Sequence, residues 1–225
     1  ILRELIDPSA APLKTLPRNE HDLMISAQNG RVLAFDNLSG ISPAMSDALC
    51  RLSTGGGFAT RGLYTDSEEI IFEAMRPIIL NGIDDLANRN DLADRALIVS
   101  LPRIPERKRK VEQDLWKEFE AAKPKLLGAL LNAVSFGLRH LNAVRLHSYP
   151  RMADFAKWVV AAEPKLPWHK GEFLEIYHQN REESALACFE SDVIAIVLKA
   201  FIEKHKQWEG TASELKKALE ANLED

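Results

Sequence analysis

Two short apolar runs that end in carboxylate or amide side chains constrain the fold of this chain more than any other feature. Arg31–Phe35 leads into Asp36 and Asn37, and Pro77–Leu80 leads into Asn81. Continuous apolar runs of this length are typical of parallel strands buried on both faces. Ligands of such sheets collect at the carboxyl ends of the strands. The pattern therefore predicts a polar site there, and plain Asp-Asn and Asn-Gly turns are the alternative.

Short apolar runs alternate with helical spacing over the first hundred residues, which is typical of a layered α/β domain with a mostly parallel sheet. We expect strands at 11–16, 31–35, 77–80 and 96–101, and helices at 20–29 and 43–53. Two β-type runs, 61–64 and 69–75, flank the polar turn Thr65-Asp66-Ser67-Glu68, which predicts a hairpin.

The chain becomes almost wholly helical after the basic stretch Arg103–Lys110. Helical patterns cover 111–141, 152–162, 172–188, 191–204 and 212–223. We therefore expect three units: an α/β core over 1–105, a helical lid over 106–188 and a small unit over 189–225. The last unit could begin a winged helix, and simple helical packing is the alternative.

Composition excludes several classes of protein. The net charge of −4 argues against a protein that binds nucleic acid over its whole surface, although a local basic groove is compatible with this charge. No apolar run approaches the roughly 20 residues of a membrane span, and no signal peptide opens the chain, so we expect a cytoplasmic protein. The six histidines and two cysteines lack the spacing of a metal site.

The chain opens at Ile1, without methionine, on a short amphipathic run that Pro8 stops. This pattern is typical of the last turns of a helix. We expect the chain to be part of a longer protein.

The order of these motifs resembles a known family. Ala34-Phe-Asp36-Asn37, Leu52-Ser-Thr-Gly-Gly-Gly57, the hairpin, Ile79-Leu-Asn81, Asp94-Arg95 and a helical lid are similar to the AAA+ ATPase cores of mobile-element primase and helicase proteins, related to the superfamily III helicases. The resemblance implies an incomplete P-loop NTPase sheet. It makes Asp36 the Walker B carboxylate that holds Mg²⁺, Asn37 a neighbour of the γ-phosphate, Asn81 sensor 1 and Arg95 the arginine finger.

Three departures accompany the resemblance. No Gly-x-x-x-x-Gly-Lys-Ser/Thr occurs, and Thr54-Gly55-Gly56-Gly57 lacks the lysine, so we expect Walker A to lie upstream of Ile1. Asn37 stands where a glutamate usually polarises water, and a carboxamide cannot act as a base. The hairpin turn is acidic, which leaves Arg61 as its cation. We expect the isolated chain not to hydrolyse ATP.

Further arginines are candidates for binding DNA or nucleotide. Arg103, Arg107 and Arg109 could follow a phosphate backbone, together with Arg61, although a solvated linker explains the first three equally well. Arg151, at the start of a lid helix, is a sensor 2 candidate for contact with the nucleotide. For Arg95, a local ion pair with Asp91 or Asp94 is the alternative to a finger that reaches a second subunit.

These patterns predict the ATP-dependent motor core of a mobile-element DNA replication protein. In the longer protein we expect ATP and Mg²⁺ as cofactors, single-stranded DNA as the partner and self-association into a ring; on the isolated chain we expect no tightly bound cofactor. The alternative is a non-catalytic scaffold that acts as a DNA-binding or protein-interaction module.

Overall fold

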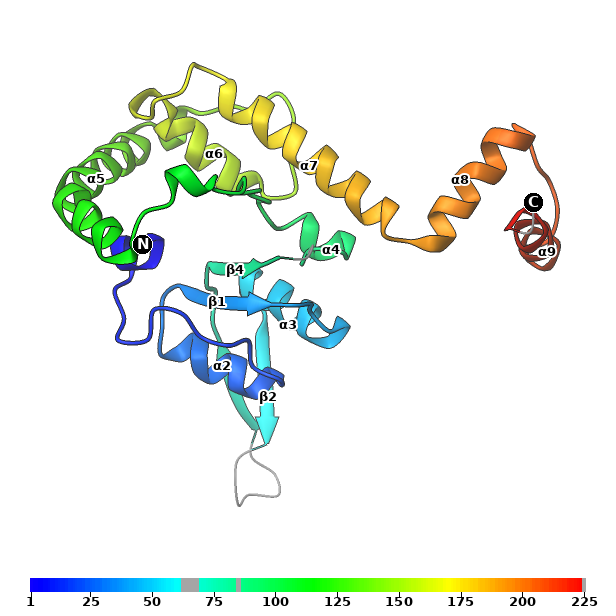
Figure 1. Cartoon of the computed structure of the whole chain (residues 1–225), viewed down its shortest axis with the longest axis horizontal. Coiled ribbons are helices and arrows are strands. Elements are labelled where there is room, and N and C mark those ends of the chain that lie inside the picture. The colour runs from blue at the N-terminus through cyan, green and yellow to red at the C-terminus, as the bar shows by residue number, and fades with distance from the viewer. Residues whose placement is uncertain (62–68, 84–85, 224–225) are drawn as a thin grey trace.

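The computed structural model describes residues 1–61, 69–83 and 86–223, which form a small α/β part, a helical part and a projecting arm (Figure 1). The strands are β1 (Leu33–Leu38), β2 (Gly57–Arg61), β3 (Glu69–Glu73) and β4 (Ile78–Gly82). The α-helices are α1 (Leu2–Ile6), α2 (Glu20–Gln28), α3 (Pro43–Thr54), α4 (Asn90–Ala93), α5 (Glu112–His140), α6 (Ala153–Ala162), α7 (Glu172–Glu190), α8 (Val193–His205) and α9 (Ala212–Leu223). Three 3-10 turns complete the structure: η1 (Glu106–Lys108), η2 (Leu141–Ala143) and η3 (Glu163–Lys165).

Strands β1 and β4 pair in parallel, with Leu33 opposite Ile78 and Phe35 opposite Leu80. On the other edge of β1, Lys14 forms an isolated parallel bridge with Phe35. β2 and β3 form a separate antiparallel pair from Gly57–Glu73 to Arg61–Glu69. The predicted hairpin therefore exists, with its first strand four residues earlier than expected.

The core of the α/β part lies between β1 and the helices α2 and α3. Leu23, Phe35, Leu49 and Leu52 are all almost fully buried in it. Local signals fix the two helices: the Asn19 side chain caps α2, and Ser42 caps α3 just before a proline at the first helical position. Gly55 ends α3 at φ 85°, a left-handed conformation that glycine adopts readily. The glycine cluster is thus a helix end followed by a strand start.

The fold predicted from the sequence, an incomplete P-loop NTPase sheet, is wrong. The described part of the chain is mostly helical, and its only parallel sheet is the pair β1–β4. The predicted strand 11–16 is reduced to the bridge at Lys14, and 96–101 forms no strand. Alternating or continuous apolar residues indicate a candidate strand, but they do not show whether a neighbouring strand is present. A strand forms only when it can pair with such a neighbour.

The helical part is built from α5, α6 and α7. Ala156 of α6 packs with Phe173 and Tyr177 of α7, whose rings are stacked with centroids 5.6 Å apart. The buried carboxylate of Glu163 accepts hydrogen bonds from the backbone N–H groups of Gly171 and Phe173, both at 2.9 Å. Glu163 therefore satisfies the amino end of α7, which has no cap from its own N-cap residue.

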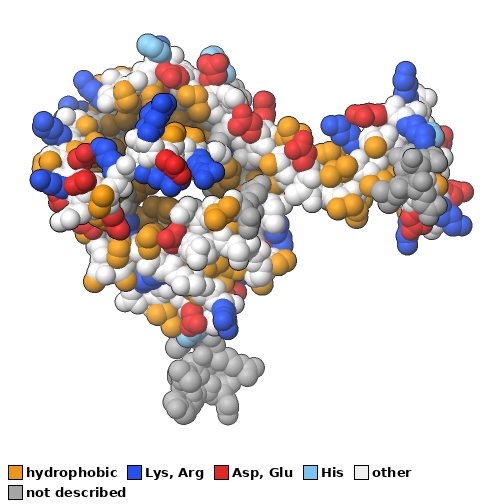
Figure 2. Space-filling model, viewed as in Figure 1, with side chains coloured by type: hydrophobic (Ala, Val, Ile, Leu, Met, Phe, Trp, Pro, Cys, Tyr) orange, Lys and Arg blue, Asp and Glu red, His pale blue; other side chains and the backbone are white. Residues whose placement is uncertain are grey.

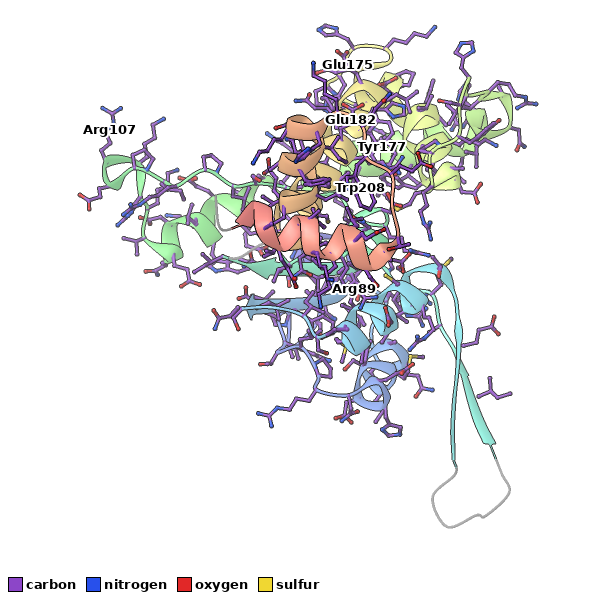
Figure 3. All side chains as sticks on the ribbon, turned by 90° about the vertical axis from the view of Figure 1, so that its right-hand side faces the viewer. Arg89, Arg107, Glu175, Tyr177, Glu182 and Trp208 are labelled. Carbon is purple, nitrogen blue, oxygen red and sulfur yellow. The ribbon has the colours of Figure 1, made fainter. Side chains whose placement is uncertain are left out.

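An irregular connection joins α4 to α5. Figure 3 shows Arg107 at its outer end, standing away from the rest of the molecule. The predicted boundary at 105 falls in this connection, and the one at 188 falls in the last turn of α7.

The two helices α8 and α9 form an arm that continues from α7 and projects from the other elements (Figures 1 and 2). Phe201 is the buried residue of α8, and its ring contacts Trp208 edge-on with centroids 6.3 Å apart. Within the described residues the arm contains helices and no strand, so no wing of a winged-helix fold is present there.

Candidate functional site

Asp36 of β1 and Asn81 of β4 lie side by side at the carboxyl ends of the two parallel strands. The Asn81 amide Nδ2 donates to the Asp36 carboxylate Oδ1 at 2.6 Å. Asp36 is half-buried and Asn81 is exposed. The structure therefore brings together the two residues that the apolar runs singled out.

A β-bulge next to this pair sets its geometry. Phe35 pairs with Leu80 and Leu38 with Gly82, so β1 advances by three residues while β4 advances by two. Asn37 takes up the extra residue at φ 57°, a left-handed conformation that asparagine tolerates better than most residues. Asn37 is exposed beside the pair, and its carboxamide makes it a possible ligand rather than a base.

The backbone around Asp36 is fixed from both sides. Lys14 N–H donates to the Ala34 carbonyl at 3.0 Å, and Asp36 N–H donates to the Lys14 carbonyl at 3.0 Å. On the β4 side, a Cβ atom added to Gly82 would lie 2.4 Å from the Leu38 carbonyl oxygen. The two strands thus approach so closely that only glycine fits at position 82.

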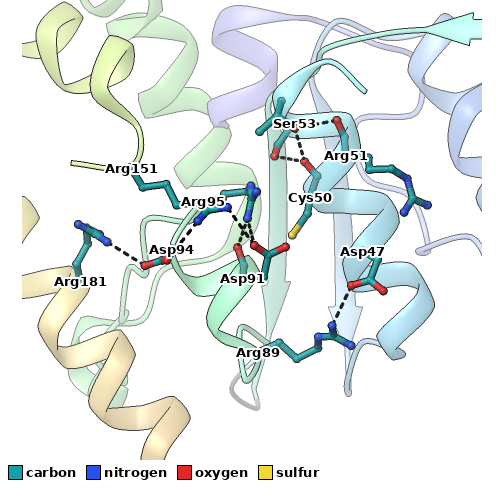
Figure 4. Close-up of polar contacts among 11 residues, drawn as sticks. Asp47, Cys50, Arg51, Ser53, Arg89, Asp91, Asp94, Arg95, Arg151 and Arg181 are labelled. Carbon is teal, nitrogen blue, oxygen red and sulfur yellow. Dashed lines mark hydrogen bonds and ion pairs between the residues drawn. The ribbon is translucent and has the colours of Figure 1, made fainter. Parts of the chain in front are cut away.

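A second group of charged residues surrounds α4 (Figure 4). Nη1 of Arg95 donates to the Asp91 carbonyl at 2.8 Å and also to the Asp91 carboxylate. Nη2 of Arg151 lies 3.2 Å from the same carboxylate oxygen, and Arg181 donates to Asp94 at 2.9 Å. This arginine cluster, made of Arg95, Arg151 and Arg181 with Asp91 and Asp94, joins α4 to the helical part.

Two groups in and beside the arginine cluster, Asp91 and Cys50, have shifted pKa values. The hydrogen bond from Arg95 is the main reason why the pKa of Asp91 lies below its ordinary value, although burial opposes it. Burial, followed by a hydrogen bond with Asp91, raises the pKa of the Cys50 thiol to about 11. Asp91 is therefore a carboxylate at neutral pH and Cys50 a protonated, unreactive thiol.

Comparison with known proteins places the chain in a family. Residues 1–165 match the family model described as the actinomycete integrative conjugative element replication protein. The chain belongs to this replication protein family. The match supports the mobile-element part of the resemblance, and it does not extend to an AAA+ helicase core. No curated protein and no solved structure matches the chain.

The residues predicted to handle nucleotide in this replication protein occupy two places. Asp36, Asn37 and Asn81 lie at the strand ends, whereas Arg95 and Arg151 meet at Asp91 in the arginine cluster. Arg95 follows α4 instead of preceding a strand, and it forms the local ion pair that was the alternative to a finger. Its action on a second subunit stays a prediction.

The structure describes the side chains of only some of the arginines that are predicted to contact DNA. Arg103, Arg107 and Arg109 are all exposed on the connection before α5. Nearby Lys110 is paired with Glu118 at 2.6 Å. The backbone of Arg61 ends β2, but its side chain and the hairpin turn at 65–68 lie outside the described residues.

Sequence reasoning missed Arg181, which anchors the arginine cluster from α7. Arg181 lies 87 positions after its partner Asp94, and no local pattern marks such a pair. Asp91 could be found because it is four residues before Arg95, the spacing of neighbours on a helix.

The described residues contain neither a metal-binding cluster of side chains nor a membrane-spanning helix. No group of three or more His, Cys, Asp or Glu side chains is placed to hold a metal ion. None of the described helices is long and apolar enough to cross a membrane.

Proposed function

We propose that this replication protein supports an ATP-dependent step in DNA replication of its mobile element, with the Asp36–Asn81 pair as the Mg²⁺–nucleotide contact. The observation that carries the proposal is the 2.6 Å contact between these two side chains at the ends of adjacent parallel strands. Mg²⁺ binds oxygen ligands and is commonly held in proteins by one or two carboxylates together with phosphate oxygens, and the Asn81 bond engages only one oxygen of the Asp36 carboxylate.

The fixed backbone suits such a role. The bulge and the flanking hydrogen bonds hold Asp36 and Asn81 in place without any ligand, which reduces the ordering that binding requires. Bound Mg²⁺ would neutralise phosphate charge, and the protein's part is to orient the ion and to leave room for phosphate. The 225 residues contain no lysine-bearing phosphate loop, so we expect no ATP turnover by this chain alone.

Arg95 would serve the same step across a subunit boundary in a ring. Its Nε is buried and has no hydrogen-bond partner among the described residues, so its present pairing leaves one donor unsatisfied. Asp91 would have to release it first. Single-stranded DNA would lie along the exposed Arg103, Arg107 and Arg109, which offer cations without fixed partners of opposite charge in the described structure.

A non-catalytic role is the second candidate. Two observations favour it: Arg95 is neutralised by Asp91 within the chain, and Asn37 cannot act as a base. In that case the chain would serve as a scaffold that binds DNA or another protein.

The copy number of the excised element in its host separates the two candidates. If Asp36 contacts Mg²⁺ and nucleotide, Asp36→Ala abolishes replication at normal protein levels, whereas Asp114→Ala, on the exposed start of α5, has no effect. If the chain is a scaffold, Asp36→Ala replicates normally, and only the joint change of Arg103, Arg107 and Arg109 to Ala reduces the copy number.

A further inference from the structure

The connection between α4 and α5 contains a short segment, 97–101, that has the exposure pattern of a strand at the edge of a sheet. Leu97, Val99 and Leu101 are 47%, 74% and 83% exposed. Ile98, between the first two, is half-buried and packs against the core of the α/β part. Apolar side chains therefore face solvent at every second position, although the segment is not paired in a sheet.

The backbone of this segment is satisfied on one edge only. The Asn180 side chain of α7 donates to the Ile98 carbonyl and accepts from the Ile98 N–H, as a neighbouring strand would. In an extended chain the polar groups of adjacent residues point to opposite edges. The N–H and C=O groups of Leu97 and Val99 therefore face away from Asn180, and they have no hydrogen-bond partner among the described residues.

The open edge is suited to an extended chain. Unpaired N–H and C=O groups along an edge are a template for a further strand, which adds main-chain hydrogen bonds and places alternate side chains beside those of the first strand. Leu97, Val99 and Leu101 would lie next to those side chains, so apolar residues are favoured there. A helix has no matching row of free main-chain groups, because its own hydrogen bonds use them.

The charge at the carboxyl end of the edge narrows the chemistry of the occupant further. Pro102 has no N–H and ends the edge. Arg103 follows it, is exposed and has no ion-pair partner among the described residues. Residues 96–110 contain five cations and a single anion, Glu106. Carboxylates on the occupant are therefore favoured beside Arg103, and cations are repelled.

We propose that the edge 97–101 binds an extended segment of a partner protein, apolar at alternate positions and acidic at the end that lies beside Arg103. The partner strand bonds to the main-chain groups of Leu97 and Val99. Asn180 holds the opposite edge, so the backbone is ordered before the partner arrives and less ordering accompanies binding.

Synthetic peptides test the proposal on the unmodified chain. Two probes share an alternating Thr-Val-Thr-Val-Thr-Val core and carry Glu-Glu at the carboxyl or at the amino end, because an edge can pair in parallel or antiparallel. We expect calorimetry to detect binding of at least one probe. Amide hydrogen exchange should then slow at Leu97 and Val99 and stay unchanged at Ile98. The same probe with N-methylated core residues should bind at least about tenfold more weakly, since it cannot donate main-chain hydrogen bonds.

Three variants of the chain locate the contact, and circular dichroism checks that each is folded. Val99→Pro removes an N–H from the open edge and should weaken peptide binding at least about tenfold. Ser100→Pro is the matched control, because its N–H lies on the edge that Asn180 holds, and it should bind as before. Arg103→Glu should bind the acidic probe more weakly and a probe with Lys-Lys in place of Glu-Glu more tightly.

The contact is independent of the Asp36–Asn81 pair, and changing Arg107 and Arg109 together to Ala should leave peptide binding unchanged. The proposal is overturned if neither probe binds up to about 1 mM, or if the N-methylated probe binds equally well, as plain apolar adhesion would. It is also overturned if rising protein concentration alone protects Leu97 and Val99 from exchange, because a second copy would then be the occupant.

Discussion

The side chain of Asn180 on α7 holds both backbone polar groups of Ile98, which lies 82 residues earlier. Asn180 Nδ2 donates to the Ile98 carbonyl at 2.6 Å, and Asn180 Oδ1 accepts from the Ile98 N–H at 3.0 Å. A neighbouring strand would make the same two bonds with this residue. The apolar run 96–101 is therefore tied to a helix by one amide instead of being paired in a sheet.

Replacing Asn180 should destabilise the junction between the α/β part and the helical part. Asn180→Ala leaves both backbone groups of the half-buried Ile98 without a partner, and we expect a loss of about 1–3 kcal/mol in the free energy of unfolding. Urea denaturation measures this. Gln179→Ala, one residue earlier and exposed, is the matched control and should change stability by less than about 0.5 kcal/mol.

Gly82 gives a second prediction, because its close approach to Leu38 supports the bulge beside Asp36. In Gly82→Ala the new Cβ would collide with a backbone oxygen, so the strands must move apart. We expect a destabilisation of about 1–3 kcal/mol. The same substitution at Gly128, inside α5 with nothing within 4 Å of the new Cβ, should stabilise the chain by about 0.5–1 kcal/mol. Equal effects at the two sites would contradict the account of the bulge.

Asp7 should make stability depend on pH in the acid range. The hydrogen bond from the Val32 N–H is the main influence that lowers the pKa of Asp7, with help from the Arg31 N–H and the charge of Arg3, against the effect of burial. A carboxyl with a lowered pKa in the folded state stabilises the fold above its unfolded pKa of about 3.9 and loses that contribution as pH falls through the folded pKa.

Unfolding by urea at several values between about pH 6 and pH 2.5 tests the role of Asp7. Asp7→Asn should be less stable than the unmodified chain near pH 6, and this difference should shrink towards pH 2.5. Asp114→Asn, on the exposed first turn of α5, should follow the unmodified chain throughout. A difference for Asp7→Asn that is constant with pH would show that its charge has no part in stability.

The sequence predicts most helices of this chain within two residues, because their signals are local. Asn19 and Ser42 mark the starts of α2 and α3, and Gly55 marks an end. The neighbouring positions of Asp36 and Asn81 also follow from sequence, since each residue follows an apolar run and parallel strands end at the same edge.

The remaining features depend on contacts between distant residues. Nothing near Ile98 indicates that Asn180 replaces a strand, and nothing near Asp94 indicates Arg181. The bulge at Asn37 shows only when the register of β1 against β4 is known. The prediction of a large sheet was wrong for this reason. Apolar runs identify candidate strands, and pairing between strands decides which of them form.

Binding of Mn²⁺, which takes the same oxygen ligands as Mg²⁺, tests the central claim most directly. Nuclear magnetic resonance of the ¹⁵N-labelled chain reports the approach of this paramagnetic ion as broadening of nearby signals. We predict that the Asn81 side-chain amide and the backbone N–H of Leu38 broaden first, that Asp36→Asn abolishes this effect, and that Asp114→Asn preserves it. Unchanged broadening in Asp36→Asn, or broadening that begins elsewhere in the chain, would contradict a metal–nucleotide contact at Asp36 and Asn81.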